Sequence, residues 1–213
     1  MTDKTDDYGG LKLAVLISGS GSNLQALIDA NLPITYVLSN RKAAYGLERA
    51  AKASIPTDVF SLFAYNKANP GKTREDYDTA LAERILAQKP DLVVLAGFMH
   101  ILSESFLNPF AAANVRILNL HPALPGEFDG AHAIDRAYDA YKQGLITRTG
   151  CMIHEVVKEV DRGQPLLIKE VPFQEGDSLA DIEERIHQVE HVIIVEATKQ
   201  ALQTLKEQKV GQA

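Results

Sequence analysis

The sequence has no tryptophan and a single cysteine, Cys151, among its 213 residues. One cysteine excludes an internal disulfide and a metal site built from several thiolates, and it is typical of a reducing, cytosolic setting. No apolar run reaches the roughly 20 residues that a membrane-spanning helix needs, so we expect no membrane interaction. The first ten residues are acidic and polar and match neither a signal peptide nor an Arg-rich transit peptide. These absences predict a cytoplasmic protein.

Basic charge is also scarce. The 22 lysine and arginine residues are outnumbered by 28 acidic ones, which gives a formal net charge of −6 at pH 7. Non-specific binding to nucleic acid needs a basic surface that displaces counterions, so we expect no nucleic-acid partner. An anionic small-molecule substrate stays compatible with this charge where helix N-termini and a few basic side chains act locally. The remaining composition is that of a globular protein, with 46% hydrophobic and 23% charged residues, and the length suits one full-sized domain.

Apolar runs of strand length alternate with helical patterns along the chain. Strands are predicted at 11–17, 34–38, 57–62, 91–98, 115–120, 149–157 and 165–171, the last two joined by a short turn. Helices are predicted at 24–30, 45–53, 74–88, 103–110 (ended near Pro109), 132–142 and 178–208. This alternation is typical of a three-layer α/β fold, with helices on both faces of a mostly parallel, twisted sheet of about seven strands and an antiparallel C-terminal hairpin. We expect residues 1–10 to be a disordered lead-in, 11–208 a single domain and 209–213 a tail.

A glycine-rich loop follows the first predicted strand. Its residues Ser18-Gly19-Ser20-Gly21-Ser22-Asn23 stand between a strand and a helix, as in a dinucleotide-binding fingerprint. Leu24 replaces the third glycine of that fingerprint, and the second strand ends in Ser39-Asn40-Arg41 without the acidic residue that holds the ribose, so we expect no NAD. Backbone N–H groups at a helix N-terminus can still bind an anion. We therefore predict a phosphate site at this loop.

The final predicted helix contains a His-x-x-Glu-His pattern. Its two histidines, His187 and His191, are one helical turn apart, a spacing that suits zinc. A third protein ligand is needed, yet no His or Cys follows His191, and the later acids, Glu196 and Glu207, lie further along the same predicted helix, Glu207 by about four turns. We expect no metal and interpret His187 and Glu190 as polar contacts on one helical face.

Asn119 and His121 stand at the end of the fifth predicted strand. Their spacing of two places a carboxamide and an imidazole on the same side of an extended segment, at the sheet edge where α/β folds bind ligands. Taken alone, such a pair is more often structural than catalytic. Asp161, in the turn of the predicted hairpin, can fold over the same edge, and the three together can orient a carbonyl, stabilise an oxyanion and move a proton. No G-x-S-x-G elbow occurs, so we expect direct transfer between two bound substrates.

Several segments together resemble the phosphoribosylglycinamide formyltransferase family of the folate-dependent formyltransferases. The likeness covers about residues 11–205 and rests on Ile17–Ala26, Leu95–Leu102, Ile117–Pro122, Glu159–Gly163 and Glu190-His191. It implies a Rossmann-like formyltransferase fold. It further implies transfer of a formyl group from the co-substrate 10-formyltetrahydrofolate to the amine of glycinamide ribonucleotide, in purine biosynthesis, through a tetrahedral intermediate. We expect small-molecule partners only, and a monomer or weak homodimer.

The resemblance also assigns roles to individual residues. It makes His121 the general acid and base, Asn119 a donor to the formyl oxygen, and Asp161 the group that raises the His121 pKa and organises the proton relay. It places the ribonucleotide phosphate on Gly21, Ser22 and Asn23, and the glycinamide end on Glu190 and His187. It lines the folate side with Arg74, Met99, His100, Ile101, Leu102, Asn119, Val157, Lys158, Glu159, Val160 and Asp161.

Some positions depart from the commonest bacterial pattern of that family. Ala123-Leu124-Pro125-Gly126 follows Pro122 where Ser-Leu-Leu-Pro is common. His100 stands where Arg is common, and His187 where Gln is common. These positions bear on loop geometry and on individual ligand contacts, and they leave the implied reaction unchanged.

Three alternative functions stay open on the sequence. Formyltetrahydrofolate hydrolase carries an extra N-terminal domain and methionyl-tRNA formyltransferase a C-terminal nucleic-acid-binding domain, and we expect neither in a chain of this length. A non-catalytic nucleotide-binding module of the same fold is favoured by loss of Asn119, His121 or Asp161, and all three are present.

Overall fold

A seven-stranded sheet forms the centre of the computed structural model, which describes residues 6–211. The strand order is β3-β2-β1-β4-β5-β6-β7. The first five strands pair in parallel, whereas β5 with β6 and β6 with β7 pair antiparallel. The strands are β1 (Leu13–Ile17), β2 (Ile34–Ser39), β3 (Thr57–Val59), β4 (Leu92–Leu95), β5 (Arg116–His121), β6 (Arg148–Glu155) and β7 (Pro165–Pro172).

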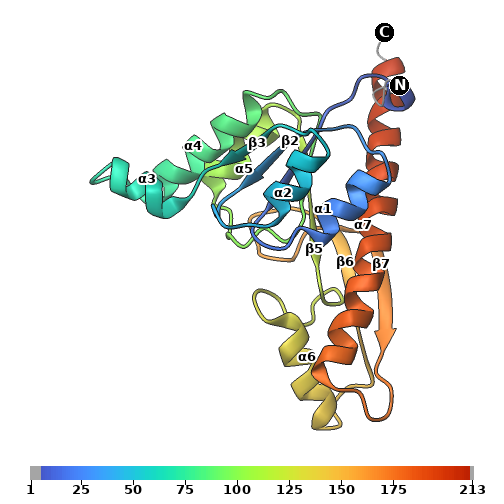
Figure 1. Cartoon of the computed structure of the whole chain (residues 1–213). Coiled ribbons are helices and arrows are strands. Elements are labelled where there is room, and N and C mark those ends of the chain that lie inside the picture. The colour runs from blue at the N-terminus through green and yellow to red at the C-terminus, as the bar shows by residue number, and fades with distance from the viewer. Residues whose placement is uncertain (1–5, 212–213) are drawn as a thin grey trace.

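Helices cover both faces of this sheet. The helices are α1 (Ser22–Asp29), α2 (Gly46–Lys52), α3 (Leu62–Ala68), α4 (Arg74–Leu86), α5 (Glu104–Ala112), α6 (Ala133–Lys142) and α7 (Leu179–Val210). Figure 1 shows α7 running the height of the molecule, with α6 low in the view and α3 projecting to the left. Within residues 6–211, no helix combines the length and the apolar character that crossing a membrane requires.

Two hydrophobic cores lie on opposite faces of the sheet. Along β1, Leu13, Val15 and Ile17 belong to the core shared with α1, α2 and α7, while Ala14 and Leu16 belong to the core shared with α4 and α5. Successive side chains of a strand point to opposite faces, so a run of apolar residues buries both. The predicted three-layer fold with an antiparallel C-terminal hairpin is confirmed.

Among the element boundaries that differ from the prediction, two have a clear physical cause. The strand predicted at 57–62 ends at Val59, because the Ser61 side chain accepts a hydrogen bond from Ala64 N and begins α3. Helix α5 continues past Pro109 to Ala112, because Phe106 and Phe110 are buried one turn apart and hold the helix on the core.

The structure describes the second half of the predicted lead-in, which includes a helical turn. Asp6–Tyr8 forms a 3-10 helix, and Tyr8 packs against the core beside α7. A partly buried aromatic side chain offsets some of the entropy of ordering a terminal segment. The rest of the lead-in, residues 1–5, lies outside the described residues, and α7 extends to Val210.

Gly150 in β6 gives a test of this packing. A Cβ atom there would lie 2.3 Å from the carbonyl oxygen of Lys169 on β7 and 2.5 Å from Leu124 Cδ2. We expect Gly150→Ala to lower the free energy of unfolding by about 1–3 kcal/mol, the usual range for overpacking. Denaturant unfolding measures it, with Ile168→Ala on the exposed side of β7 as the control. A Gly150→Ala protein as stable as the control would show that the two strands and the Leu124 segment can move apart freely.

Candidate active site

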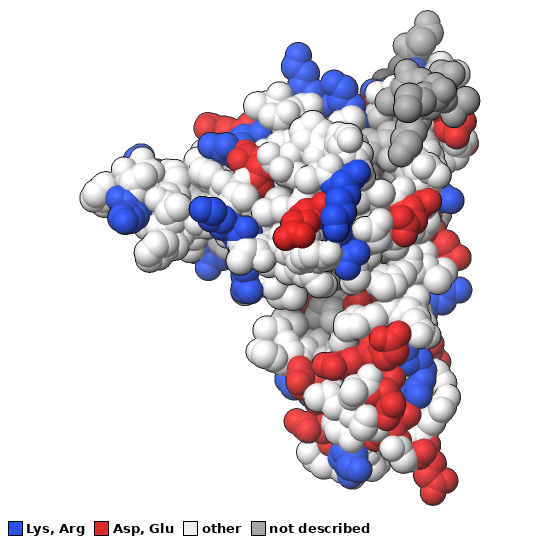
Figure 2. Space-filling view, viewed as in Figure 1, with Lys and Arg blue, Asp and Glu red and all other residues white. Residues whose placement is uncertain are grey.

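The candidate site lies where loops follow the carboxyl ends of neighbouring strands. Residues 18–21 follow β1, residues 96–103 follow β4, and residues 122–132 follow β5. Because β1, β4 and β5 are adjacent in the sheet, these loops meet at one edge, where parallel α/β sheets bind their ligands. In Figure 2 the outline of the molecule is indented between the arm that carries α3 and the lower part that carries α6.

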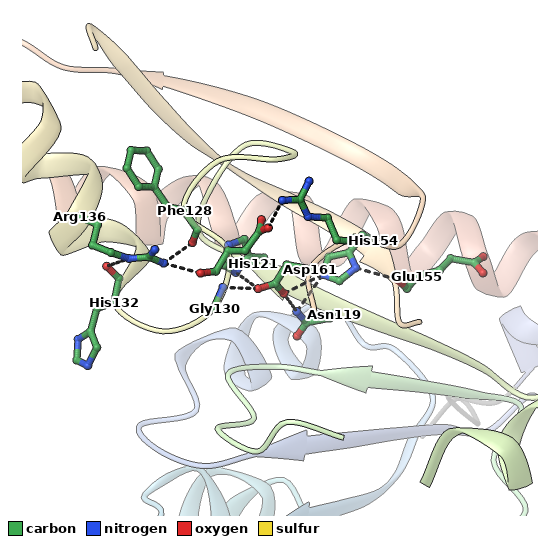
Figure 3. A network of polar contacts seen from close by, with 11 residues as sticks. Asn119, His121, Phe128, Gly130, His132, Arg136, His154, Glu155 and Asp161 are labelled. Carbon is green, nitrogen blue, oxygen red and sulfur yellow. Dashed lines mark hydrogen bonds and ion pairs between the residues drawn. The ribbon is translucent and has the colours of Figure 1, made fainter. Parts of the chain in front are cut away.

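Asp161 brings the predicted catalytic residues together (Figure 3). Its Oδ2 lies 3.3 Å from His121 Nδ1 and accepts a hydrogen bond from Gly130 N at 2.8 Å. Its Oδ1 accepts from Asn119 Nδ2 at 3.3 Å and lies 3.4 Å from His154 Nε2. The Asp161 side chain is only 8% exposed. Residues from β5, β6 and two loops therefore share one buried carboxylate.

The chain folds the Asp161 turn tightly over the sheet edge. Asp161 has a φ of 56°, a left-handed conformation that aspartate tolerates better than most residues. At Gly163 a Cβ atom would lie 1.6 Å from the carbonyl oxygen of Glu155, so only glycine lets the turn approach β6 this closely. Arg162 in the same turn pairs with Asp129 of the loop after β5 at 2.6 Å. The turn predicted from sequence thus reaches the edge where His121 lies.

Burial and charge act in opposite directions on His121. Burial lowers the pKa of His121, and this effect exceeds the upward effects of the Asp161 carboxylate and the Phe128 carbonyl, while the neighbouring His154 adds to the decrease. Asp161 thus acts on the His121 pKa in the expected upward direction, but burial outweighs it and the net pKa is lowered. The reason is that the imidazole is 4% exposed, and desolvation disfavours its charged form.

The resulting charge states define a base. Burial alone would raise the pKa of Asp161, but the neighbouring His154, the hydrogen bond from Gly130 N and the proximity of His121 lower it overall. Near neutral pH the carboxylate is therefore ionised and His121 neutral, with the Nδ1 proton facing Asp161. His121 Nε2 has no hydrogen-bond partner among residues 6–211 and carries the free lone pair.

His154 is a residue that sequence reasoning missed. It pairs with Asn119 across β5 and β6, and its Nδ1 donates to the Glu155 carbonyl at 2.8 Å. In the neutral ring Nε2 therefore accepts, and Asn119 Nδ2 donates to it at 3.0 Å. The signal in the sequence is a histidine inside the predicted 149–157 strand, but its position opposite Asn119 depends on the strand register.

The predicted phosphate loop is held at a close contact between α1 and α2. Gly21 has a φ of 71°, and a Cβ atom there would lie 2.5 Å from Gly46 Cα. Gly46 N donates to the Gly19 carbonyl at 3.1 Å, and Arg49 Nε donates to the Ser20 carbonyl at 2.9 Å. The loop therefore begins α1 with a fixed backbone path, and Gly46 is a second residue that sequence reasoning missed.

The other residues expected on the ribonucleotide side lie on α1 and α7. Asn23 Nδ2 donates to Glu190 Oε2 at 3.2 Å, and both side chains are buried. Burial raises the pKa of Glu190, opposed by the hydrogen bond from Asn23 and by the nearby His187. His187, one turn before Glu190, is exposed. Across residues 6–211, no group of three or more His, Cys, Asp or Glu side chains is arranged to hold a metal ion.

On the folate side, the segment after β4 alternates between outward and inward side chains. Met99 is 66% exposed and Ile101 is also exposed, whereas Leu102 is buried in the core. The imidazole of His100 points inward, with Nε2 2.6 Å from Oδ1 of the fully buried Asp78. The His100 ring is therefore held by the protein, and its main chain is the part that can face a ligand. Arg74, at the start of α4, donates to the Ile101 carbonyl.

Residues 157–160 form the second segment of the predicted folate side, alongside residues 99–102. Val157 and Val160 are exposed apolar residues, and Glu159 is exposed as well. Lys158 Nζ lies 3.1 Å from Oε1 of Glu104, the first residue of α5. This ion pair joins residues 157–160 to the end of the loop that follows β4. Exposed apolar side chains from two loops thus border one part of the site, a composition that suits an aromatic ligand.

These observations match the comparisons with known proteins. The chain belongs to the formyl transferase family, whose family model matches residues 11–198. It is 54% identical over 199 residues to the phosphoribosylglycinamide formyltransferase of Schizosaccharomyces pombe. The alignment covers 89% of this chain and 96% of that protein. The protein of the same name from Dictyostelium discoideum is 50% identical over 197 residues, covering 88% and 96%.

Solved structures give the same result. Phosphoribosylglycinamide formyltransferase from Streptococcus pneumoniae superposes with a TM-score of 0.80 at 34% identity, covering 90% of this chain and 98% of that one. Glycinamide ribonucleotide transformylase 1 from Symbiobacterium toebii also gives a TM-score of 0.80, at 38% identity, covering 91% and 88%. Within the formyl transferases, the chain is thus a member of the phosphoribosylglycinamide formyltransferases and an enzyme. The family resemblance drawn from the sequence is confirmed, and the hydrolase and non-catalytic alternatives are not favoured.

The contacts of Asp161 predict how His121 titrates. Asp161→Asn keeps the shape and tolerates the left-handed backbone, but it removes the negative charge that opposes burial. We expect the pKa of His121 to fall further, so that the ring stays neutral to lower pH. An NMR titration of His121 in both proteins measures this. The same titration of the exposed His132 is the control, and a His121 curve that does not move would show that Asp161 exerts no charge effect on the ring.

Proposed function

We propose that the chain transfers the formyl group of 10-formyltetrahydrofolate to the amine of glycinamide ribonucleotide, with His121, Asn119 and Asp161 as its catalytic residues. The observation that carries this proposal is geometric: His121 lies against the buried Asp161 carboxylate beside Asn119, and its Nε2 has no hydrogen-bond partner among residues 6–211. That arrangement supplies a base, a donor and a fixed negative charge at one position. The family membership supports the reaction, and the two borders of the site support the two substrates.

The ribonucleotide phosphate is proposed to bind at the N-terminus of α1. There the backbone N–H groups of Ser22 and Asn23 and the helix dipole favour an anion, and Gly21 lets the loop pack closely against Gly46 and keep this path. Glu190 and His187, on α7, are proposed to hold the glycinamide end. Asn23 connects the two parts through its hydrogen bond to Glu190.

The folate is proposed to lie between the segments Met99–Leu102 and Val157–Asp161. The exposed side chains of Met99, Ile101, Val157 and Val160 suit its aromatic rings, and the main chain of both segments supplies hydrogen-bond partners. Arg74 carries a positive charge beside this segment, which suits the carboxylates at the other end of the folate.

The chemical step follows from the charge states. An α-amino group has a pKa of about 8, so a useful fraction of the substrate amine is neutral near pH 7 and can attack the formyl carbon. As the new C–N bond forms, His121 Nε2 takes the amine proton, and Asp161 stabilises the imidazolium that results. His121 then returns the proton to N10 of the folate, and the bond from the formyl carbon to N10 breaks.

The oxyanion of the tetrahedral intermediate needs a donor aimed at it. Asn119 Nδ2 has two hydrogens, one facing His154 Nε2 at 3.0 Å and the other facing Asp161 Oδ1 at 3.3 Å. We propose that the longer contact, to Asp161, is exchanged for the formyl oxygen when the folate binds. His154 then keeps the amide in place through the shorter contact.

The reaction is tested by measuring formyl transfer with and without glycinamide ribonucleotide. We expect tetrahydrofolate to form only when the ribonucleotide is present, and His121→Ala to lower kcat by roughly 10² to 10⁴, the scale for a lost acid-base group. His132→Ala is the control, because that imidazole is exposed and lies outside the network around Asp161. Near-normal turnover by His121→Ala, or release of formate without the ribonucleotide, would contradict the assignment.

The phosphate site is tested with a matched pair of glycines. Gly21→Ala places a Cβ atom against Gly46 in a strained backbone conformation, whereas a Cβ atom at Gly19 meets nothing within 4 Å. We expect Gly21→Ala to raise KM for the ribonucleotide about tenfold or more, with a much smaller effect on KM for the folate, and Gly19→Ala to change both less. Equal changes in the two KM values for Gly21→Ala would place the phosphate elsewhere.

A further inference from the structure

A ring of hydrogen bonds joins Ser18, Asn40 and Met99. Ser18 Oγ donates to Asn40 Oδ1 at 2.6 Å and accepts from Met99 N at 2.6 Å. Asn40 Nδ2 completes the ring by donating to the Met99 carbonyl at 3.3 Å. Ser18 is only 3% exposed, and its own N–H donates to the Gly97 carbonyl at 3.1 Å. Both main-chain polar groups of Met99 are thus bound by side chains from other loops.

The three residues stand at the ends of three strands. Ser18 follows β1 and opens the loop proposed to bind phosphate, while Asn40 directly follows β2. Met99 lies after β4 in the segment proposed to face the folate. The ring therefore spans the boundary between the two proposed substrate sites, although neither Ser18 nor Asn40 is among the residues assigned to a ligand.

The position of Asn40 explains why the second strand is followed by an amide and not by an acidic residue. A dinucleotide-binding fold has an acidic residue at the end of its second strand, and this chain has an amide there. The side chain at this position has to accept from Ser18 and donate to Met99, and a carboxylate can only accept. The residue type therefore fits a link within the protein.

We infer that Asn40 is a positioning residue that couples the two substrate sites, an inference that rests on the proposed function. A ribonucleotide bound at the loop that begins at Ser18 holds Ser18 in place, and through the ring it holds the Met99 main chain in the position that the folate requires. Such coupling is reciprocal, so the folate improves ribonucleotide binding by the same factor.

The coupling is measured with ligands that cannot react. Tetrahydrofolate carries no formyl group, so it can be titrated calorimetrically into the wild-type enzyme with and without saturating glycinamide ribonucleotide. We expect the ribonucleotide to lower Kd for tetrahydrofolate by a factor of about 5 or more, the range of ordinary allosteric coupling. The reverse titration gives the same factor.

The decisive variant is Asn40→Asp, which keeps the shape and the contact with Ser18 but sets two acceptors against each other at Met99. We expect its coupling factor to fall to about 1, and KM for the folate to rise several-fold with little change in kcat. Ser18→Ala breaks the same ring from the other side and should behave alike. Lys42→Gln is the control, because that exposed residue in the same segment has no part in the ring.

The outcomes separate this inference from the function on which it rests. If the wild-type enzyme neither transfers the formyl group nor binds the two ligands, the proposed function fails and the coupling with it. If the wild-type enzyme is active but binds the two ligands independently, the coupling is overturned alone. The same holds if Asn40→Asp and Ser18→Ala, folded as judged by Tm, keep the wild-type coupling factor.

Discussion

A buried carboxylate has to be surrounded by hydrogen-bond donors, because a charge removed from water without partners is strongly destabilising. Asp161 meets this requirement through Asn119 on β5, Gly130 N in the loop after β5 and the imidazole of His121, and His154 on β6 lies against the same carboxylate. These partners come from parts of the chain that are far apart in sequence. The need to surround one charge therefore fixes the hairpin turn, the loop and the end of β5 relative to one another.

The same burial sets the chemistry of the site. Removing water stabilises the neutral form of His121 more than the Asp161 carboxylate stabilises the charged form, so the pKa of His121 is lowered. A neutral ring with a free Nε2 is ready to accept a proton, and the adjacent carboxylate stabilises the imidazolium only after that transfer. Asp161 thus stabilises the His121 imidazolium that forms during proton transfer, while His121 stays neutral in the enzyme without substrates.

Much of the fold could be predicted from the sequence, because the alternation of buried strands and amphipathic helices reports directly on a layered sheet. The placement of Asn119 and His121 on the same side of β5 followed from the two-residue period of a strand. The roles of His154 and Asn40 could not be predicted, since the first depends on the register between β5 and β6 and the second on the packing of three loops. The direction of the His121 pKa was also beyond the sequence, because it depends on how completely the ring is buried.

The central claim is that His121 rests as a neutral base with its proton on Nδ1. Nitrogen-15 NMR of the ring at pH 7 measures this directly, because protonated and unprotonated imidazole nitrogens have well-separated chemical shifts. The account predicts a protonated Nδ1 facing Asp161 and an unprotonated Nε2 in the enzyme without substrates. A ring protonated on both nitrogens at that pH, or a neutral ring with its proton on Nε2, would contradict it.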